Sequence, residues 1–454
     1  MKTSGKFRIV AAVCVLIVSL TAAVPGRIIH VDDDATGAAD GTSWVNAFPY
    51  LQDGLAAANQ GDEIRVAQGT YRPNQGVTVV PIPGGRGHAP EIEIGPRYRP
   101  FRVKSGLTLR GGFAGIGAND PNAREVKRYE TILSGDLNGD DAAGWLPEDP
   151  VYESTRTDNI SVVVESEAAV LDGCVIQSAT ESGLHNTDGG LRVMNCTFRW
   201  NSAAGLFCYG GRSDLENCLF QENSRGSSGG GMMASGRTYR TTHGEVTFPA
   251  RLTLRECRFL NNSAWSGGAI CTGDSHLSLI ACSFEGNTAR TGAAVQQFRG
   301  SLALQDCRFE GNLAIQSGGA VDLLNLETAT VTRCSFRGNR AVRGGAISNQ
   351  EGPLTLDSSI FNGNRAEFGG AIEVVSASWS TVPPGRNDIL MGGCLFTGNL
   401  ALESGAALYA GPRAEFTITS CTFADNWART AGWSGPPTSP RGACPVRPRP
   451  PSLR

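Results

Sequence analysis

The sequence predicts an all-β fold, a single-stranded right-handed parallel β-helix with an N-terminal capping helix. Three observations predict it: one short unit recurs nine times, its apolar positions alternate with period two, and turn residues punctuate every copy. Glycine alone supplies 58 of the 454 residues, which is typical of a chain with many tight turns. A unit of this kind buries its apolar face only when copies stack on one another.

The full unit reads apolar-x-apolar-x-x-Cys-x-Phe-x-x-Asn, followed by a few variable residues and Gly-Gly-Ala-Ile or Gly-Gly-Ala-Val. An earlier, degenerate copy carries Cys174 and Ile176. The nine full copies share a Cys or Ser, a Phe two residues later and an Asn three residues beyond: Cys196, Cys218, Cys257, Cys282, Cys307, Cys334, Ser359, Cys394 and Cys421; Phe198, Phe220, Phe259, Phe284, Phe309, Phe336, Phe361, Phe396 and Phe423; Asn201, Asn223, Asn262, Asn287, Asn312, Asn339, Asn364, Asn399 and Asn426.

The spacing of the copies indicates one coil per copy. Successive Cys positions are 22, 22, 39, 25, 25, 27, 25, 35 and 27 residues apart, and the shortest step corresponds to one turn of the coil. The two long steps hold insertions at residues 236–251 and 376–388. We expect both on surface loops, because the repeats that flank them stay intact.

Within one copy, alternation separates core-facing from solvent-facing side chains: Leu252, Leu254 and Phe259 inward, Thr253, Arg255 and Arg258 outward. The alternation slips at residues 255–256, which predicts a bend or bulge. We expect Asn262 to turn the chain in a left-handed conformation, and Gly267 and Gly268 to make a second corner before an inward strand at residues 269–270.

Stacking at about 4.8 Å per coil would create ladders of Phe, Cys and Asn side chains through the molecule. Each Phe would bury roughly 150–250 Å², on the order of 4–6 kcal/mol. Neighbouring Cys residues would have Cα atoms within disulfide range, but in-register Cβ atoms lie further apart than a bridge prefers. We favour buried thiols, a choice that Ser359 in one position supports, and no C-x-x-C spacing indicates zinc.

The N-terminal residues 1–23 read as a signal peptide. Lys2, Lys6 and Arg8 precede an apolar stretch, and residues 21–23 are small. The apolar stretch is too short for a membrane span and no second one follows. The chain is therefore expected to be exported, either secreted or associated with the cell surface or outer membrane, with no transmembrane span after signal removal.

The remaining chain divides into four segments. Residues 28–71 contain a strand and a capping helix, in which Phe48, Leu51, Leu55 and Ala58 share one face and which Gly61 and Asp62 end. Residues 72–98 form a Pro- and Gly-rich loop insertion, and residues 99–430 form the β-helix. Residues 431–454 form a Pro- and Arg-rich tail that we expect to be disordered, after a last repeat whose decay suggests a truncated or shifted reading frame.

These repeats resemble known families. The Phe-x-x-Asn and Gly-Gly-Ala-Ile elements resemble the repeats of polymorphic outer-membrane proteins, and "VDDDATGAADGTSW", "GGFAG" and "TILSGDLNGDD" resemble exported bacterial right-handed β-helix repeat proteins. The resemblance covers roughly residues 28–430 and implies a surface-exposed protein, since some members are adhesins. The tail after residue 430 departs from the autotransporter pattern, so insertion into an outer membrane by that segment is not expected.

The β-helix fold also occurs in enzymes that cleave acidic polysaccharides, and two motifs bear on that alternative. Polygalacturonase-like hydrolases carry Asn-Thr-Asp with further Asp, His and Arg/Lys motifs, and here only residues 186–188 match, for which we favour a turn. Pectate-lyase-like enzymes show Arg-x-Pro-x-x-Arg, which Arg449, Pro451 and Arg454 match within the tail. Neither match comes with the rest of a site, so no catalytic residue is assigned.

One acidic stretch is the candidate metal site. In "DLNGDD", Asp136, Asn138 and Asp140 have the spacing of the first ligands of a calcium loop, but the Gly at the sixth position and the acid at the twelfth are missing. We favour a solvated turn there and a solvated strand end for Asp32, Asp33 and Asp34. No cofactor is expected, and Ca²⁺ is the one ion kept as an alternative.

The preferred function is therefore a structural, adhesive or binding role at a cell surface, without catalysis. The partner would be a cell-surface polysaccharide or the surface of a host or neighbouring cell, and the protein would be a monomer. A net charge of −3 without charged blocks excludes nucleic acid as an expected partner. The alternative is a pectate-lyase-like polysaccharide lyase or hydrolase beside the insertions, and a carbohydrate-binding module without turnover lies between the two.

Overall fold

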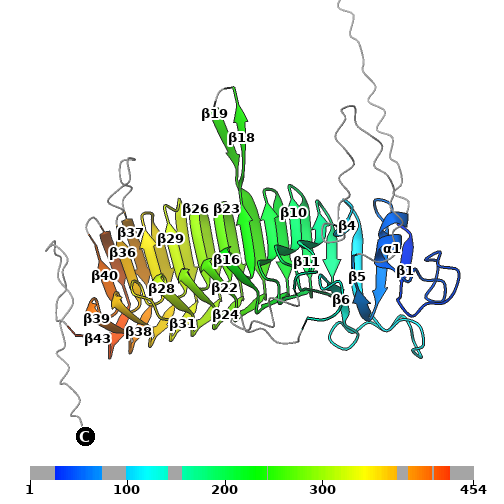
Figure 1. The fold of residues 1–454 in the computed structure, drawn as a ribbon. Coiled ribbons are helices and arrows are strands. Elements are labelled where there is room, and N and C mark those ends of the chain that lie inside the picture. The colour runs from blue at the N-terminus through cyan, green and yellow to red at the C-terminus, as the bar shows by residue number, and fades with distance from the viewer. Residues whose placement is uncertain are drawn as a thin grey trace, which may run out of the picture.

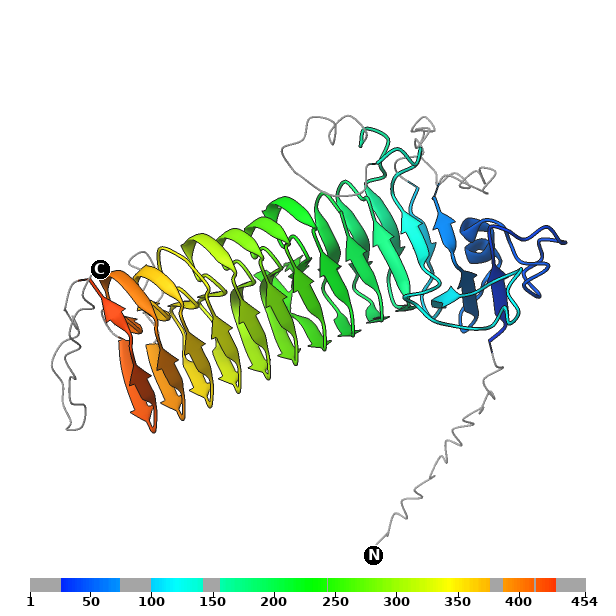
Figure 2. The ribbon, with the colours of Figure 1, turned by 90° about the horizontal axis from the view of Figure 1, so that it is seen from below.

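The chain forms a right-handed parallel β-helix, as the sequence predicts. The computed structural model describes residues 26–73, 99–141, 156–242, 244–375, 387–411 and 414–429. Figures 1 and 2 show the coils stacked along one long axis, with the N-terminal coils at one end and the last repeats at the other. Each strand pairs in parallel with the equivalent strand of the next coil, so the repeat becomes a stack of strand rows.

Four strand rows run along the stack, and a repeat passes through them in order. Rows 1 and 2 form one sheet, because the 11-residue strands β23 and β26 run through both. Row 1 contains β4 Phe101–Val103, β7 Val162–Ser166, β10 Ser182–Thr187, β13 Ala204–Tyr209, β17 Met232–Ser235, the first part of β23 Ile270–Ile280 and of β26 Val295–Gln305, β29 Val321–Leu324, β32 Ile347–Gln350, β36 Ile372–Val375 and β40 Leu408–Ala410. Row 2 contains β1 Ile28–Val31, β2 Glu63–Ala67, β5 Thr108–Phe113, β8 Val170–Asp172, β11 Gly190–Met194, β14 Arg212–Glu216, β20 Ala250–Arg255, the second part of β23 and β26, β30 Thr328–Thr332, β33 Leu354–Asp357, β37 Asn387–Gly392 and β41 Ala414–Thr419.

Rows 3 and 4 are made of shorter strands. Row 3 contains β3 Gly69–Tyr71, β6 Thr131–Ser134, β9 Cys174–Gln177, β12 Thr197–Arg199, β15 Leu219–Gln221, β21 Arg258–Leu260, β24 Ser283–Glu285, β27 Arg308–Glu310, β31 Ser335–Arg337, β34 Ile360–Asn362, β38 Leu395–Thr397 and β42 Thr422–Ala424. Row 4 contains β16 Ser224–Ser228, β22 Ser263–Ser266, β25 Thr288–Thr291, β28 Leu313–Ser317, β35 Arg365–Phe368, β39 Leu400–Ser404 and β43 Trp427–Ala428, and single bridges at Arg340 and Arg343 link β28 to β35.

The phenylalanines of row 3 form the predicted ladder. From Phe198 to Phe423, neighbouring ring centroids are 4.6 to 4.9 Å apart and the rings are within 5° of parallel. Stacked rings usually prefer an offset, so this face-to-face spacing reflects the strand separation of about 4.8 Å that the backbone imposes. All members up to Phe396 are fully buried, which confirms the inward assignment.

The asparagines form a ladder of satisfied amides, which corrects one prediction. Asn262 does not make the left-handed turn: the residue before it, Asn261, has φ +53°, and Asn262 itself is fully buried. Its Nδ2 donates to Asn287 Oδ1 (3.0 Å) and to the Phe220 carbonyl (2.9 Å), and its backbone N–H donates to the same Oδ1 (2.9 Å). The Asn262 side chain therefore stabilises the fold more inside the coil than it would at the corner. Burial of an amide costs little free energy when all its hydrogen-bond partners are present.

The other predicted features of the unit are confirmed. Leu252, Leu254 and Phe259 are buried, and the alternation slips at Glu256, which has φ +54°. Gly267 has φ +60° at the second corner, and β23 begins with the buried Ile270.

The cysteines of the repeat are free thiols, buried in every copy except the last, where Cys421 is partly exposed. Cys257 is fully buried, and its Sγ donates to the Arg255 carbonyl (3.3 Å). Burial raises the pKa of Cys394 to about 11, so the thiol is held protonated at neutral pH. Ser359 reproduces the thiol contacts, since its Oγ donates to the Asp357 carbonyl (2.9 Å) and accepts from the Cys334 N–H (3.0 Å). This explains why Ser and Cys exchange at the same position.

The N-terminal end is covered by the one helix of the described residues. Helix α1, Leu51–Ala57, packs beside β1 and β4 with Leu51 and Leu55 buried, which agrees with the predicted cap (Figure 1). It ends at Ala57 and not at the predicted Gly61 and Asp62, because the chain is already extended at Ala58. No helix in this part of the chain has the length and apolarity of a membrane span.

The larger insertion is a surface hairpin, as expected. Strands β18 Arg237–Thr241 and β19 Gly244–Phe248 pair antiparallel and project from the stack (Figure 1). Most of the second insertion, the loop predicted at 72–98 from residue 74 onward, the signal peptide and the tail lie outside the described residues.

The Phe ladder yields a first prediction. Phe309→Asp places a carboxylate between two stacked rings, so we expect a loss of more than about 4 kcal/mol in the free energy of unfolding. Arg308→Asp changes the adjacent solvent-facing side chain and should cost less than about 1 kcal/mol. Urea denaturation of both variants is the measurement, and equal stability would contradict the inward and outward assignment.

The Asn ladder yields a second prediction. Asn287→Ala removes the Oδ1 atom that accepts hydrogen bonds from both the backbone N–H and the Nδ2 of Asn262. It also leaves the Phe259 carbonyl without its side-chain donor. We expect a loss of about 3 kcal/mol or more, measured by urea denaturation, since each stranded buried group costs about 1–3 kcal/mol. Thr288→Ala, on the exposed side of the next strand, is the matched control and should change stability by less than about 0.5 kcal/mol. Similar losses in both variants would show that the ladder does not hold the stack.

Candidate functional site

The three N-terminal acids do not share one environment. Asp32 is only 2% exposed, so the predicted solvated strand end is wrong for this residue. Its carboxylate accepts the backbone N–H of Ile116 (2.6 Å) and of Asp34 (3.2 Å), which ties β1 to the turn after β5. Asp33 and Asp34 are exposed. The carboxylate oxygens of the three acids lie within 4.8 Å of one another, but Asp32 is occupied by structural hydrogen bonds.

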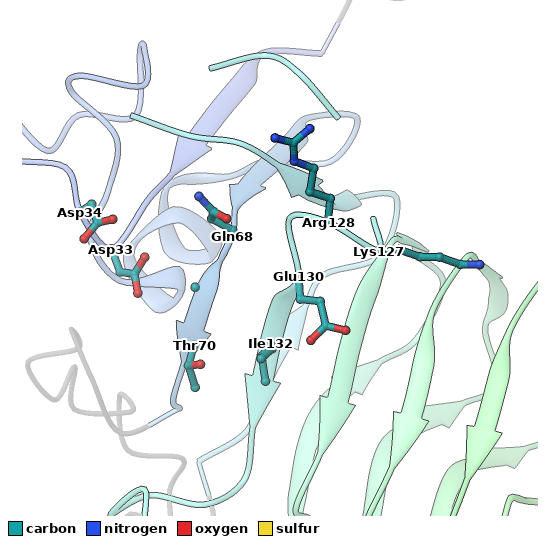
Figure 3. Close-up of a pocket in the computed structure, with 9 residues that line it drawn as sticks. Asp33, Asp34, Gln68, Thr70, Lys127, Arg128, Glu130 and Ile132 are labelled. Carbon is teal, nitrogen blue, oxygen red and sulfur yellow. The ribbon is translucent and has the colours of Figure 1, made fainter. Parts of the chain in front are cut away.

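A shallow depression of about 560 Å³ opens beside these acids, between β3 and β6. It is lined by Asp33, Asp34, Gln68, Gly69, Thr70, Lys127, Arg128, Glu130 and Ile132. In Figure 3, Asp33 and Asp34 lie on one side and Glu130 on the other, while Lys127 points away. Asp33 is exposed as a whole, but its carboxyl group packs against Gly69, and this partial burial, followed by the neighbouring Asp34, raises the pKa of Asp33. The depression therefore brings acidic and basic groups to one hollow without directing them at a common point.

The candidate calcium loop is closed by Asp136. Its Oδ1 accepts the N–H of Gly139 (2.6 Å) and of Asp140 (3.2 Å), and its Oδ2 accepts the N–H of Asp141 (3.3 Å). Carboxylate oxygens of Asp136, Asp140 and Asp141 lie within 4.8 Å of one another. Asn138 instead uses its backbone N–H, which donates to Asp158 Oδ2 (2.8 Å). The structure thus brings two of the three predicted residues together and adds Asp141, the next residue of "DLNGDD".

Asp141 is the acid of this loop that contacts side chains of the following segment. Its Oδ2 accepts from Asn159 Nδ2 (2.9 Å) and lies 3.8 Å from Arg156 Nε. Burial raises the pKa of Asp141. Calcium requires six to eight oxygen ligands, and a guanidinium beside the cluster already supplies positive charge. The loop can hold a cation only with ligands beyond these three acids, so calcium stays the untested alternative to the turn that the sequence favours.

The two enzyme-like motifs are placed as follows. The turn that the sequence favoured over residues 186–188 is confined to Asp188, which has φ +55° between β10 and β11. Asn186 and Thr187 are the last residues of strand β10, where Asn186 is fully buried. Asp188 pairs with Arg237 at the base of the hairpin. Arg449, Pro451 and Arg454 lie outside the described residues.

Row 4 presents an exposed face that combines aromatic, apolar and basic side chains. We call this the row 4 face and define it by Trp265, Arg290, Leu313, Ile315, Arg340 and Arg365. Alternation creates it, because the residues between point inward as small buried alanines such as Ala264, Ala289 and Ala314. Trp265, Leu313 and Ile315 are 55%, 47% and 70% exposed. Exposed apolar groups gathered in this way are typical of interaction surfaces.

Two features give the row 4 face its chemistry. The Arg290 guanidinium lies over the Trp265 ring, 4.4 Å from its centroid, and so places a positive charge against an indole that is 55% exposed. Arg340 bridges Leu313 on one side and Arg365 on the other, so consecutive coils place these side chains next to one another. Sequence reasoning missed this face, although Trp265 and Arg290 occupy the same position after Asn in successive repeats.

Buried acids lie beside the row 4 face. Asp322 of β29 and Glu373 of β36 are 1% and 0% exposed, although they follow an inward residue and point away from the core of the coil. Arg343 Nη1 donates to Glu373 Oε1 (2.8 Å). Sequence reasoning missed both acids. The signal that could have found them is an acid directly after Gly-Gly-Ala-Val or Gly-Gly-Ala-Ile, at the position where other copies have Cys271, Gln296 or Ser348.

Comparison with known proteins agrees with the fold. Residues 158–340 and 267–436 match the family described as right handed beta helix region. A metabotropic glutamate receptor-like protein R of Dictyostelium discoideum is 28% identical over 111 residues, 24% of this chain and 6% of that protein. The chain therefore spans only a small part of that relative.

Solved structures with a similar outline include lyases and α-1,3-glucanases. The pectate lyase Pel9A has a TM-score of 0.41 and 14% identity, covering 90% of this chain and 82% of its own. A rhamnogalacturonan lyase has a TM-score of 0.36 and 14% identity, covering 90% and 88%. Identities and scores at this level transfer no activity to this chain.

The Asp136 loop yields a third prediction. Asp136→Ala removes the acceptor of three backbone N–H groups and should speed hydrogen exchange at the amides of Gly139, Asp140 and Asp141, with about 1–3 kcal/mol lost locally. Asp140→Ala, an exposed member of the same cluster, should leave these amides unchanged. A calcium-dependent rise in melting temperature that both variants abolish would show instead that the loop holds the ion.

Proposed function

Because the chain belongs to the right-handed β-helix family, we propose that it is a non-catalytic binding protein whose row 4 face attaches to an anionic polysaccharide. The proposed setting is outside the cell, secreted or at the cell surface, which is what the signal peptide predicted at residues 1–23 would imply. The observation that carries the proposal is Trp265 with Arg290 stacked upon it, on an exposed face of a rigid stack.

The pair supplies both halves of sugar recognition. An indole ring offers a flat, apolar surface with a negative π-face, against which the C–H groups of a pyranose ring can pack. The guanidinium offers several donors in a planar fork that matches a carboxylate. A uronic-acid unit presents a pyranose ring and a carboxylate together, so the pair fits this class of sugar better than a neutral one.

The geometry of the stack favours a polymer over a small ligand. Neighbouring coils repeat at about 4.8 Å, and Arg340 and Arg365 hold paired positions on neighbouring coils. Arg290 lies in the adjacent column of row 4, in register with Trp265. Within the described residues, Arg340 and Arg365 form no ion pair, so their positive charges are not neutralised by a neighbouring acid, although the chain as a whole has a net charge of −3. A polyanion that runs along row 4 can contact arginines of both columns, and linked contacts raise the overall affinity above that of any single contact.

Cleavage of an acidic polysaccharide is the second candidate, and the depression between β3 and β6 favours it. That hollow holds Asp33, Glu130 and Arg128, which are groups of the kind that hydrolases and lyases use. New unsaturated ends, detected by ultraviolet absorbance, or new reducing ends would identify such an activity.

Retention on immobilised polymers tests the proposal and yields a fourth prediction. We expect the purified protein to be retained on polygalacturonate and alginate but not on a neutral glucan, without releasing unsaturated or reducing ends. The double variant Trp265→Ala/Arg290→Ala should bind about tenfold more weakly, a change of about 1.4 kcal/mol.

A matched control is available on another face. Arg299 lies over the Phe298 ring at 4.6 Å, which is the same kind of pair in the turn between rows 1 and 2. Phe298→Ala/Arg299→Ala should leave retention unchanged. Equal losses in the two double variants would refute the row 4 face as the site, and polymer cleavage would refute a non-catalytic role.

A further inference from the structure

The corner between row 4 and row 1 covers a carboxylate that alternation would leave in solvent. Glu373 follows the inward Ile372 in β36 and therefore points outward from row 1, yet it is fully buried. The chain that leaves row 4 folds over it, with Arg343 and Phe368 paired across neighbouring coils at this corner. A buried carboxylate without full compensation is costly, so this arrangement calls for an explanation.

Glu373 belongs to a line of polar side chains on the outward side of row 1. The register places Gln296, Asp322, Ser348 and Glu373 on successive coils. Asp322 is also buried, but it accepts hydrogen bonds from Gln296 Nε2 (3.2 Å) and Gln350 Nε2 (3.4 Å), on separate oxygens. Glu373 differs, because within the described residues its Oε2 has no hydrogen-bond partner.

The charged partner of Glu373 is half in solvent. The Arg343 side chain is 49% exposed, donates from Nη1 to Glu373 Oε1 (2.8 Å), and lies over the Phe368 ring at 5.3 Å. Arg343 follows three residues after Arg340 and bridges the same pair of coils, so it stands at the edge of the row 4 face. One guanidinium is thus shared between a buried carboxylate and an exposed binding surface.

The groups around Glu373 and Asp322 determine how readily each of these two buried acids is protonated. Among the described residues, the charged or titratable groups around it are Arg343 from the corner, Asp322 from β29 and the register neighbour Tyr409 from β40. Burial raises the pKa of Glu373 to about 7, Arg343 opposes this shift and Asp322 adds to it. Burial also raises the pKa of Asp322, but its amide donors oppose that shift. Glu373 has one oxygen without a hydrogen-bond partner, and a proton can be placed there.

We propose that Glu373 is a proton-controlled counterion of Arg343, so that the row 4 face binds an anionic polysaccharide more tightly when Glu373 is protonated. When the carboxylate is ionised, Arg343 is neutralised by its partner and a negative charge lies under the face. When the carboxylate takes a proton from water, Arg343 is released to pair with a polymer carboxylate. This inference rests on the proposed function and adds its regulation.

Linkage makes the proposal reciprocal. If protonation of Glu373 strengthens polymer binding, polymer binding must favour protonation of Glu373 by the same factor. The complex should therefore take up protons when it forms near neutral pH. The size of the effect is that of one partly exposed ion pair, about two- to fivefold in affinity.

The experiment, a fifth prediction, measures binding of a galacturonate oligosaccharide by calorimetry from about pH 5.5 to 8.5, where the ligand stays ionised. Wild-type affinity should fall two- to fivefold as pH rises. Glu373→Gln should keep the low-pH affinity throughout, and Arg343→Gln should keep the high-pH affinity throughout. Asp306→Asn, which removes an exposed acid paired to Arg333 on another face, should retain the wild-type slope.

A stability measurement reads the same group without ligand. The pKa of Glu373 is higher in the folded state than in the unfolded chain, so its contribution to stability is present at low pH and lost as pH rises through about 7. The urea midpoint of the wild type should therefore fall between about pH 5 and 8, and Glu373→Gln should show a smaller fall.

The outcomes separate the two proposals. Binding that is independent of pH, or that keeps its slope in Glu373→Gln, overturns the regulation and leaves the proposed function standing. An absence of binding at every pH overturns the proposed function, and the regulation with it. A pH slope that disappears in both Glu373→Gln and Arg343→Gln supports both.

Discussion

The amide ladder is the interaction on which the rest of this structure depends. A buried asparagine amide is costly unless both donors and the acceptor find partners, and here those partners are the same amide and a backbone carbonyl of adjacent coils. Asn262 is satisfied only if Asn287 occupies the identical register, and Asn287 only if Asn312 does. The ladder thus forces successive coils into register, and the stacked phenyl rings follow at the strand spacing.

This constraint explains which parts of the structure could be predicted. The inward positions were readable because each has to match its neighbours above and below, as Leu254, Cys257 and Phe259 do. The left-handed turn was misassigned to Asn262 because asparagine serves both turns and buried amide ladders, and composition does not separate the two uses. Asp32 was placed in solvent because its partner, the Ile116 N–H, lies 84 residues away in sequence.

The candidate sites were harder to predict for the same physical reason. Ladder positions repeat, whereas surface chemistry comes from positions that vary between copies, such as Trp265 and Arg290. Their proximity depends on register across row 4, which becomes visible only when the coils are stacked. The burial of Glu373 depends further on how a corner folds over an outward side chain, and periodicity carries no information on this. Asp136 and Asp140, adjacent in one loop, were local enough to be found.

A stack of this kind can also accommodate a group that destabilises it locally. Burying the Glu373 carboxylate costs free energy when it is ionised, and Arg343 offsets that cost only from one side. In a small domain, the free-energy cost of one buried carboxylate would be a large fraction of the free energy of unfolding. Here the coils above and below are held by their own amide and phenyl contacts, so the cost stays confined to one corner. Positions that differ between the repeats are therefore where a β-helix can carry binding residues and the residues that regulate them. Asp322 and Glu373, the acids beside row 4, occupy such positions.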